Sequence, residues 1–170
     1  MDLKTLIRDV PDFPKPGILF RDITPLLSAP EGLRAVVEPL AARYRDSGVT
    51  KIVAIESRGF IFGAALALEL GIGFVPVRKK GKLPHVCRAE TYDLEYGSDT
   101  VEIHADALNT GERVVIVDDV IATGGTLAAA CRLVAALGAE VHEAACVIEL
   151  TFLPGREQLG GVPFHALVEY

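Results

Sequence analysis

Two adjacent carboxylates, Asp118 and Asp119, follow a run of four branched apolar residues from Val114 to Val117. Such a run predicts a short buried strand, so the two carboxylates are expected at its carboxyl end. Adjacent carboxylates repel each other, which argues that their pairing serves a purpose. Ionised carboxylates only accept hydrogen bonds, and they therefore suit the hydroxyls of a sugar or the water shell of a cation.

A turn of small residues comes next, Ala122-Thr123-Gly124-Gly125-Thr126, and leads into an apolar helix pattern from Leu127 to Leu137. Glycines let the backbone approach a ligand closely, and threonine hydroxyls can donate to a phosphate. The start of the helix adds unpaired N–H groups and the positive end of the helix dipole. The ending of a Walker A loop and the spacing of a dinucleotide fingerprint are both missing. The turn therefore predicts a site for a phosphorylated sugar, with an ordinary strand-to-helix turn as the alternative.

Two further polar segments follow predicted strands. Glu56, Ser57 and Arg58 come after the apolar run that ends at Ile55, and a cation-rich stretch from Arg78 to Lys82 follows the next run. Because ligands of open α/β sheets bind beyond the carboxyl ends of the strands, both segments are expected to face one crevice. Arg58 offers a fork of donors for phosphate oxygens, and the cations of the second segment predict a pyrophosphate site. The alternatives are a surface pair between Arg58 and Glu56 and a solvated charged face.

A fourth polar segment runs from Glu90 to Gly97, where alternation puts Glu95 opposite Leu94 and Tyr96. This pattern predicts one strand of a pair and allows the carboxylate of Glu95 to point toward the crevice. A polar strand face without a function is the alternative.

Helix and strand periods alternate along the chain, which predicts an α/β fold with a parallel sheet wrapped by helices. The segment up to about residue 30 does not fit this alternation, and it is expected to form a flap over the site. We expect a single domain over residues 1–170, with a hood at 1–30, a core at 31–170 and a flexible loop at 83–97. The predicted helices are 3–8, 29–46, 59–70 and 127–137, and the predicted strands are 51–55, 74–78, 90–96, 100–104, 114–117, 141–150 and 165–168.

The composition is typical of a folded, cytoplasmic protein. Half of the 170 residues are hydrophobic, and the net charge of −6 argues against a nucleic-acid-binding surface. No apolar run reaches the roughly 18 residues needed to span a membrane, and the first residues lack the core of a signal peptide. Three cysteines at unrelated spacings predict reduced thiols, with Cys131 and Cys146 in the core and Cys87 in a polar loop.

The segment 114–126 resembles the phosphoribosyl pyrophosphate (PRPP) signature of the type I phosphoribosyltransferases, and almost the whole chain resembles the adenine phosphoribosyltransferases among them. The proline-rich block 13–27 and the residues 94–97 are more specific to the adenine enzymes than the PRPP signature is. The resemblance implies a type I fold with a central parallel five-stranded sheet, flanking helices and a small N-terminal hood. It implies a pentosyltransferase of purine salvage that converts adenine and PRPP to AMP and pyrophosphate. It also implies Mg²⁺ bound through PRPP and water rather than by the protein, and a cytoplasmic homodimer.

Matching positions take their roles from the same resemblance. The 5′-phosphate is expected on the turn 122–126, the ribose hydroxyls on Asp118 and Asp119, and the adenine between Leu19, Phe20 and Arg21. Phe20 would stack on the purine while backbone groups of Leu19 and Arg21 read its 6-amino edge. Glu95 would exchange a proton with the purine imidazole, and Tyr96 would help to close the site. The residues expected around pyrophosphate are Glu56, Ser57, Arg58, Arg78, Lys79 and Lys82, with a cis peptide at Glu56–Ser57.

Two other functions remain open from the sequence. One is a phosphoribosyltransferase for a different purine base, because the geometry of the backbone around Leu19 to Arg21 decides which base fits. The other is a PRPP-sensing regulator without catalysis, built on the same fold. A regulator usually carries a nucleic-acid-binding domain and a basic face, and the sequence predicts neither.

Overall fold

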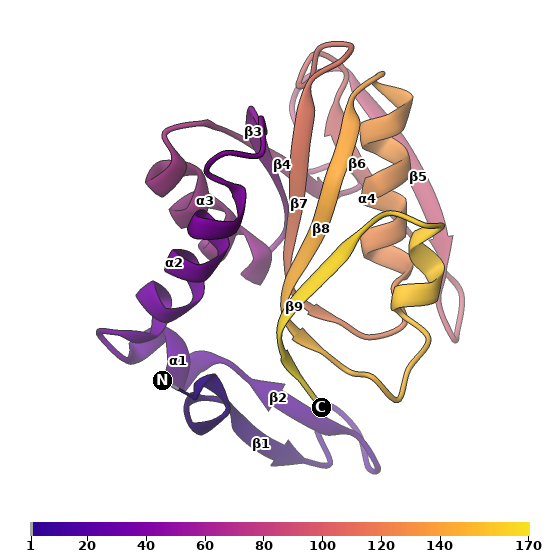
Figure 1. The fold of residues 1–170 in the computed structure, drawn as a ribbon. Helices are drawn as coiled ribbons and strands as arrows, with labels where there is room; N and C mark the ends of the chain where they lie inside the picture. Colours follow the sequence, from indigo (N-terminus) through magenta and orange to yellow (C-terminus); the bar gives the residue numbers. More distant parts are fainter. Residues whose placement is uncertain (1) are drawn as a thin grey trace.

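A mixed seven-stranded sheet forms the centre of the molecule in a computed structural model that describes residues 2–170 (Figure 1). Five neighbouring strands, in the order β4-β3-β7-β8-β9, are parallel, as the sequence predicts. An antiparallel hairpin of β5 and β6 extends the sheet beyond β4. The strands are β3 (Lys51–Ile55), β4 (Gly73–Lys79), β5 (Cys87–Asp93), β6 (Ser98–His104), β7 (Arg113–Ile121), β8 (Glu140–Glu149) and β9 (Phe164–Glu169).

Helices cover both faces of the sheet. The helices α2 (Gly32–Tyr44) and α3 (Arg58–Leu70) lie on one face, and α4 (Gly125–Ala136) lies on the other (Figure 1). Successive residues of a strand point to opposite faces, so β7 supplies Val115 and Val117 to one apolar cluster and Val114 and Ile116 to the other. Two cores therefore fix the central strand from both sides.

The first 30 residues form a separate layer. A 3₁₀ turn η1 (Leu3–Leu6) precedes an antiparallel hairpin of β1 (Arg8–Pro11) and β2 (Leu19–Asp22), and the short helix α1 (Thr24–Ser28) leads into the core. The hairpin lies across the end of the sheet where β9 finishes (Figure 1). A second 3₁₀ turn, η2 (Arg156–Leu159), connects β8 to β9. Among residues 2–170, no helix has both the length and the hydropathy required to cross a bilayer.

Three predicted boundaries are wrong in an informative way. The strand β7 does not stop before the two aspartates but continues to Ile121, because β8 goes on pairing with it as far as Glu149. The strand β4 likewise runs beyond the predicted strand 74–78 to include Lys79, which the sequence pattern assigned to a basic loop. The segment 83–97 is not one loop, since β5 occupies its centre and only the turn 94–97 holds Glu95.

Candidate active site

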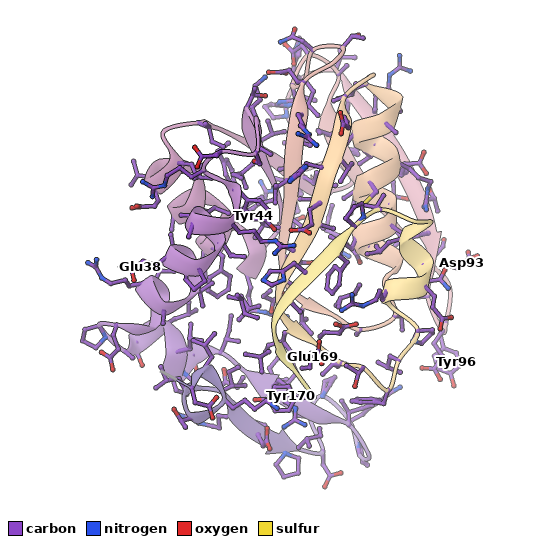
Figure 2. All side chains as sticks on the ribbon, viewed as in Figure 1. Glu38, Tyr44, Asp93, Tyr96, Glu169 and Tyr170 are labelled. Atoms are coloured by element: carbon purple, nitrogen blue, oxygen red, sulfur yellow. The ribbon has the colours of Figure 1, made fainter. Side chains whose placement is uncertain are left out.

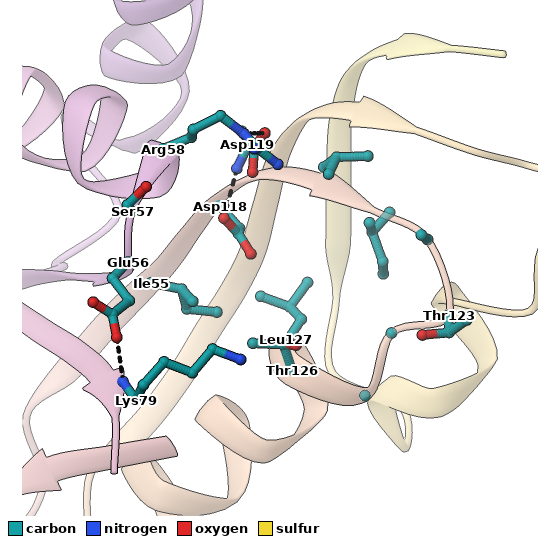
Figure 3. Close-up of a pocket in the computed structure, with 15 residues that line it drawn as sticks. Ile55, Glu56, Ser57, Arg58, Lys79, Asp118, Asp119, Thr123, Thr126 and Leu127 are labelled. Atoms are coloured by element: carbon teal, nitrogen blue, oxygen red, sulfur yellow. Dashed lines mark hydrogen bonds and ion pairs between the residues drawn. The ribbon is translucent and has the colours of Figure 1, made fainter. Parts of the chain in front are cut away.

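A pocket opens where β3 and β7 end and α3 and α4 begin (Figure 3). The topology brings the two strands side by side in parallel, so both polar turns face the same space. Residues of three predicted groups line it: Glu56, Ser57 and Arg58; Lys79; and Asp118, Asp119 and the turn Ala122 to Thr126. The pocket is also lined by Ile55, Val120, Ile121 and Leu127.

The turn Ala122 to Thr126 is shaped by glycine. Gly124 has a φ of +84°, which L side chains rarely adopt, and a Cβ there would lie 2.3 Å from the carbonyl oxygen of Gly155. The helix α4 begins at Gly125, and its bond from the N–H of Ala128 to the oxygen of Gly124 closes the first turn. The N–H groups before Ala128 therefore lie ahead of the intrahelical ladder, where they can bind an anion at the positive end of the helix.

The two aspartates have different environments. Asp119 is buried, with 6% of its surface exposed, and accepts a 2.5 Å hydrogen bond from Nε of Arg58. Asp118 accepts the backbone N–H of Asp119 at 2.8 Å. Burial, and next the charge of Asp119, raise the pKa of Asp118 well above its ordinary value. A negative charge on Asp118 is therefore unfavourable until a ligand or cation arrives to stabilise it.

Glu56 organises the opposite wall of the pocket (Figure 3). Its peptide bond to Ser57 is cis, as the resemblance implied. Its carboxylate accepts the N–H of Lys79 at 2.5 Å and Nη2 of Arg78 at 2.9 Å. Burial opposes the ionisation of Glu56, but these hydrogen bonds outweigh it and lower the pKa. The surface pair between Arg58 and Glu56 is not formed, because Arg58 pairs with Asp119 and Arg78 takes its place.

The structure also connects the pocket to a residue that the sequence analysis missed, Tyr92 of β5. The hydroxyl of Thr126 donates to the Tyr92 hydroxyl at 2.9 Å, and Nζ of Lys79 lies 3.5 Å from that same oxygen. Lys79 in turn forms an ion pair with Asp99 of β6. Tyr92 is buried, whereas Thr91 and Asp93 on either side of it are exposed. The alternation of polar and apolar residues in this strand was therefore the sequence signal from which an inward-facing Tyr92 could have been predicted.

The remaining predicted residues lie outside the pocket lining. Arg78 is held by Glu56, and Lys82 is exposed in the turn after β4. Glu95 and Tyr96 are exposed in the turn between β5 and β6 rather than on a strand face. Two contacts nevertheless bring the hood to the site: the Arg58 guanidinium lies 5.7 Å from the centre of the Phe20 ring, and Nζ of Lys15 lies 5.6 Å from that of Tyr96.

The phosphoribosyl transferase domain family matches residues 23–156. An adenine phosphoribosyltransferase of Acaryochloris marina is 58% identical over 170 residues, which is the whole of both chains. The chain belongs to the adenine phosphoribosyltransferase family. Its reaction transfers the 5-phosphoribosyl group of PRPP to adenine and gives AMP and pyrophosphate. This assignment decides against a different purine base and against a PRPP sensor without catalysis.

Solved structures of adenine phosphoribosyltransferases agree with the fold. The enzyme of Thermoanaerobacter pseudethanolicus has a TM-score of 0.96 at 49% identity, with 99% of this chain and 98% of that chain covered. The Saccharomyces cerevisiae enzyme, complexed with an imino-altritol bisphosphate and adenine, has a TM-score of 0.93 at 45% identity, with 98% of this chain and 96% of that chain covered. The α/β phosphoribosyltransferase fold expected from the sequence is confirmed, with a mixed rather than purely parallel sheet.

Proposed function

We propose that PRPP binds in the pocket with its 5′-phosphate on the turn 122–126 and its ribose hydroxyls at Asp118 and Asp119. The observation that carries this proposal is the turn itself, in which a left-handed Gly124 and the start of α4 face two carboxylates on the adjoining strand. The pyrophosphate then lies toward Arg58 and Lys79, with Glu56 and Ser57 supplying the backbone of that wall. Arg78 acts by orienting Glu56, and Lys82 adds charge from the turn beyond.

Adenine is proposed to bind between the pocket and the hood, with Phe20 against its face and backbone groups of Leu19 and Arg21 at its edge. The contact of Arg58 with the Phe20 ring supports this placement, because Arg58 also lines the pocket. The yeast relative, which is complexed with an imino-altritol bisphosphate and adenine, supports separate sites for a phosphorylated sugar and for the base in this chain.

The chemistry follows from that arrangement. The bond from ribose C1 to pyrophosphate breaks, the leaving oxygens keep the electron pair, and the purine imidazole nitrogen forms the new bond to C1. Arg58 and Lys79 stabilise the negative charge that develops on the leaving group. The nitrogen loses its proton, which Glu95 accepts when the turn 94–97 closes over the base with Tyr96. Closure also excludes water, which could otherwise attack C1.

We propose that Mg²⁺ enters this pocket with PRPP. Asp119 already accepts a hydrogen bond from Arg58, so the carboxylate of Asp118 is the better placed of the two to face the water shell of a PRPP-bound cation. When bound, the cation supplies positive charge to the pyrophosphate oxygens.

The protein is further proposed to act as a cytoplasmic homodimer. The outer face of α3 exposes Ile61 and Leu68, which lie two turns apart, with exposed fractions of 40% and 84%. Leu68 also lines a groove between α2 and α3 together with Leu33 and Val37. This apolar stripe, formed by Ile61 and Leu68, is the surface we assign to the second copy.

The proton-transfer role of Glu95 is tested by Glu95→Gln, which keeps the size of the side chain. We expect kcat to fall by about 10²- to 10⁴-fold while the Kd for PRPP, measured by calorimetry with Mg²⁺, stays unchanged. Glu102→Gln, a carboxylate of the same hairpin that accepts the N–H of Gly81, is the control. Normal turnover by Glu95→Gln would exclude the role.

The base pocket is tested by offering adenine, hypoxanthine, guanine and xanthine in parallel to the unchanged protein. AMP should form from adenine, and no nucleotide should form from the other three bases.

A further inference from the structure

We propose that Tyr170 is a positioning residue for the adenine pocket, acting through the side chain of Arg21. This inference rests on the proposed function, in which the backbone of β2 reads the base. The Arg21 guanidinium lies 3.7 Å from the centre of the Tyr170 ring, which is a stacking distance. Figure 2 shows Tyr170 beside Glu169 at the end of β9, next to the β1–β2 hairpin.

Strand alternation explains why Arg21 can hold the pocket without entering it. Neighbouring residues of β2 point to opposite faces, so the Arg21 side chain lies on one face of the hairpin and the Phe20 ring lies on the other. Phe20 faces Arg58, which lines the pocket, while Arg21 faces Tyr170 and its ion-pair partner Asp9 across the hairpin. Only 15% of the Arg21 side chain is exposed, so its guanidinium is constrained. The contacts of Arg21 with Tyr170 and Asp9 therefore also restrain the β2 backbone, which carries the neighbouring Phe20.

Tyr170 is itself held firmly to the core. Its N–H donates to the oxygen of Glu149 at 2.9 Å, and its oxygen accepts the N–H and the hydroxyl of Thr151 at 2.9 and 2.8 Å. The carboxylate of Glu149 is buried and binds Arg156 through two hydrogen bonds, of 3.0 and 2.5 Å. The next residue back, Gly155, is the one whose carbonyl packs against Gly124. The hood is thus connected, through Tyr170, to the same loop that supports the phosphate-binding turn.

The test compares Tyr170→Leu, which removes the aromatic face, with Tyr170→Phe, which keeps it. Tyr170→Leu should raise the KM for adenine by about two- to fivefold, the range that a cation–π contact at a partly exposed site supports, and leave the KM for PRPP unchanged. Tyr170→Phe should behave like the unchanged protein. Lys4→Met is the matched control, because Nζ of Lys4 lies 4.9 Å from the centre of the same ring but belongs to η1 rather than to the hairpin.

An unchanged KM for adenine in Tyr170→Leu, or an equal rise for both substrates, would overturn the proposal. If Tyr170→Leu folds poorly, Arg21→Met gives a second route: its effect on adenine should match that of Tyr170→Leu, and the double variant should be no worse than either. Additive losses would overturn the proposal as well. Failure of the proposed function looks different, because the unchanged protein would then form no AMP from adenine and PRPP.

Discussion

At the scale of single residues, Asp118 is a carboxylate whose charge the fold disfavours. Its pKa is raised by burial and by Asp119, whereas in the unfolded chain it ionises at its ordinary value. As the pH rises above that ordinary value, the unfolded state ionises first, so stability is lost until the folded pKa is passed. At neutral pH the charge of Asp118 therefore opposes folding, in the place where the proposed ligand and its cation would bind.

Asp118→Asn should consequently raise the free energy of unfolding at pH 7.5, by an amount on the order of 1 kcal/mol, while weakening PRPP binding. Asparagine keeps the Oδ1 that accepts the N–H of Asp119. The gain should be largely lost near pH 3.5, where the aspartate is mostly protonated in both states. Urea unfolding at the two pH values measures both effects.

Glu112→Gln is the control, because the fold shifts the pKa of Glu112 in the direction opposite to that of Asp118. The N–H of Asn109 and the Lys51 ammonium lower the pKa of Glu112, so its charge stabilises the fold above its ordinary pKa. The substitution should lower stability at pH 7.5. A gain for Asp118→Asn that is equal at both pH values would refute the assignment to charge.

At the scale of elements, the pairing of β5 with β6 places Tyr92 against the turn 122–126, the proposed phosphate site. A Cβ on Gly125 would lie 2.9 Å from Cδ2 of Tyr92, so ring and turn are packed closely. The Thr126 hydroxyl donates its hydrogen bond to the Tyr92 hydroxyl. This bond holds the Thr126 side chain in a rotamer that points toward the hairpin before any ligand binds. The hairpin that carries Glu95 and the turn proposed to hold the phosphate therefore meet at the Tyr92 hydroxyl.

Tyr92→Phe should keep the packing and remove that hydroxyl. We expect the KM for PRPP to rise by about two- to tenfold, the equivalent of one hydrogen bond, because Thr126 loses the partner that orients it. Thr91→Val is a matched control on the other face of β5, where the Thr91 hydroxyl bonds only across the strand pair to Thr100. Steady-state kinetics in PRPP distinguishes the two, and equal effects of both substitutions would contradict this role of Tyr92.

Elements with clear periodicity were predictable from the sequence, and β3 is the clearest case, with its predicted and observed bounds both at Lys51 and Ile55. Pairing between distant segments was not predictable. The strand β7 runs on through two aspartates because β8 continues beside it, and no local propensity signals that. The partners of Arg58 and Arg78 were likewise undetermined, because which carboxylate each one meets depends on how the strands are ordered.

At the scale of the whole molecule, the apolar stripe on α3 is the feature that points beyond one chain. Leu68→Glu should convert the proposed dimer into a folded monomer, because a charge in the centre of an apolar interface loses its hydration on association. Val86→Glu, an equally drastic change of an exposed apolar residue in the turn after β4, should leave the dimer intact. Sedimentation velocity measures both, and a dimer that persists in Leu68→Glu would exclude this surface.

Three cations in and beside the site share one property, which is that each already has a counter-charge. Arg58, Arg78 and Lys79 are all paired with carboxylates of the same chain, namely Asp119, Glu56 and Asp99. Binding a polyanion at Arg58 and Lys79, the two that line the pocket, is therefore an exchange of partners rather than the neutralisation of free charge. Added salt weakens both the internal pairs and the new ones, so PRPP affinity should depend less on ionic strength than two free cations would suggest.

Asp99→Asn would change that balance for Lys79 alone. With its internal competitor gone, Lys79 should bind PRPP more tightly at low salt, by up to about fivefold, and the advantage should disappear at high salt. Calorimetric titration with PRPP across a range of salt concentrations tests this expectation, and weaker binding at low salt would show that Asp99 orients Lys79 instead of competing for it.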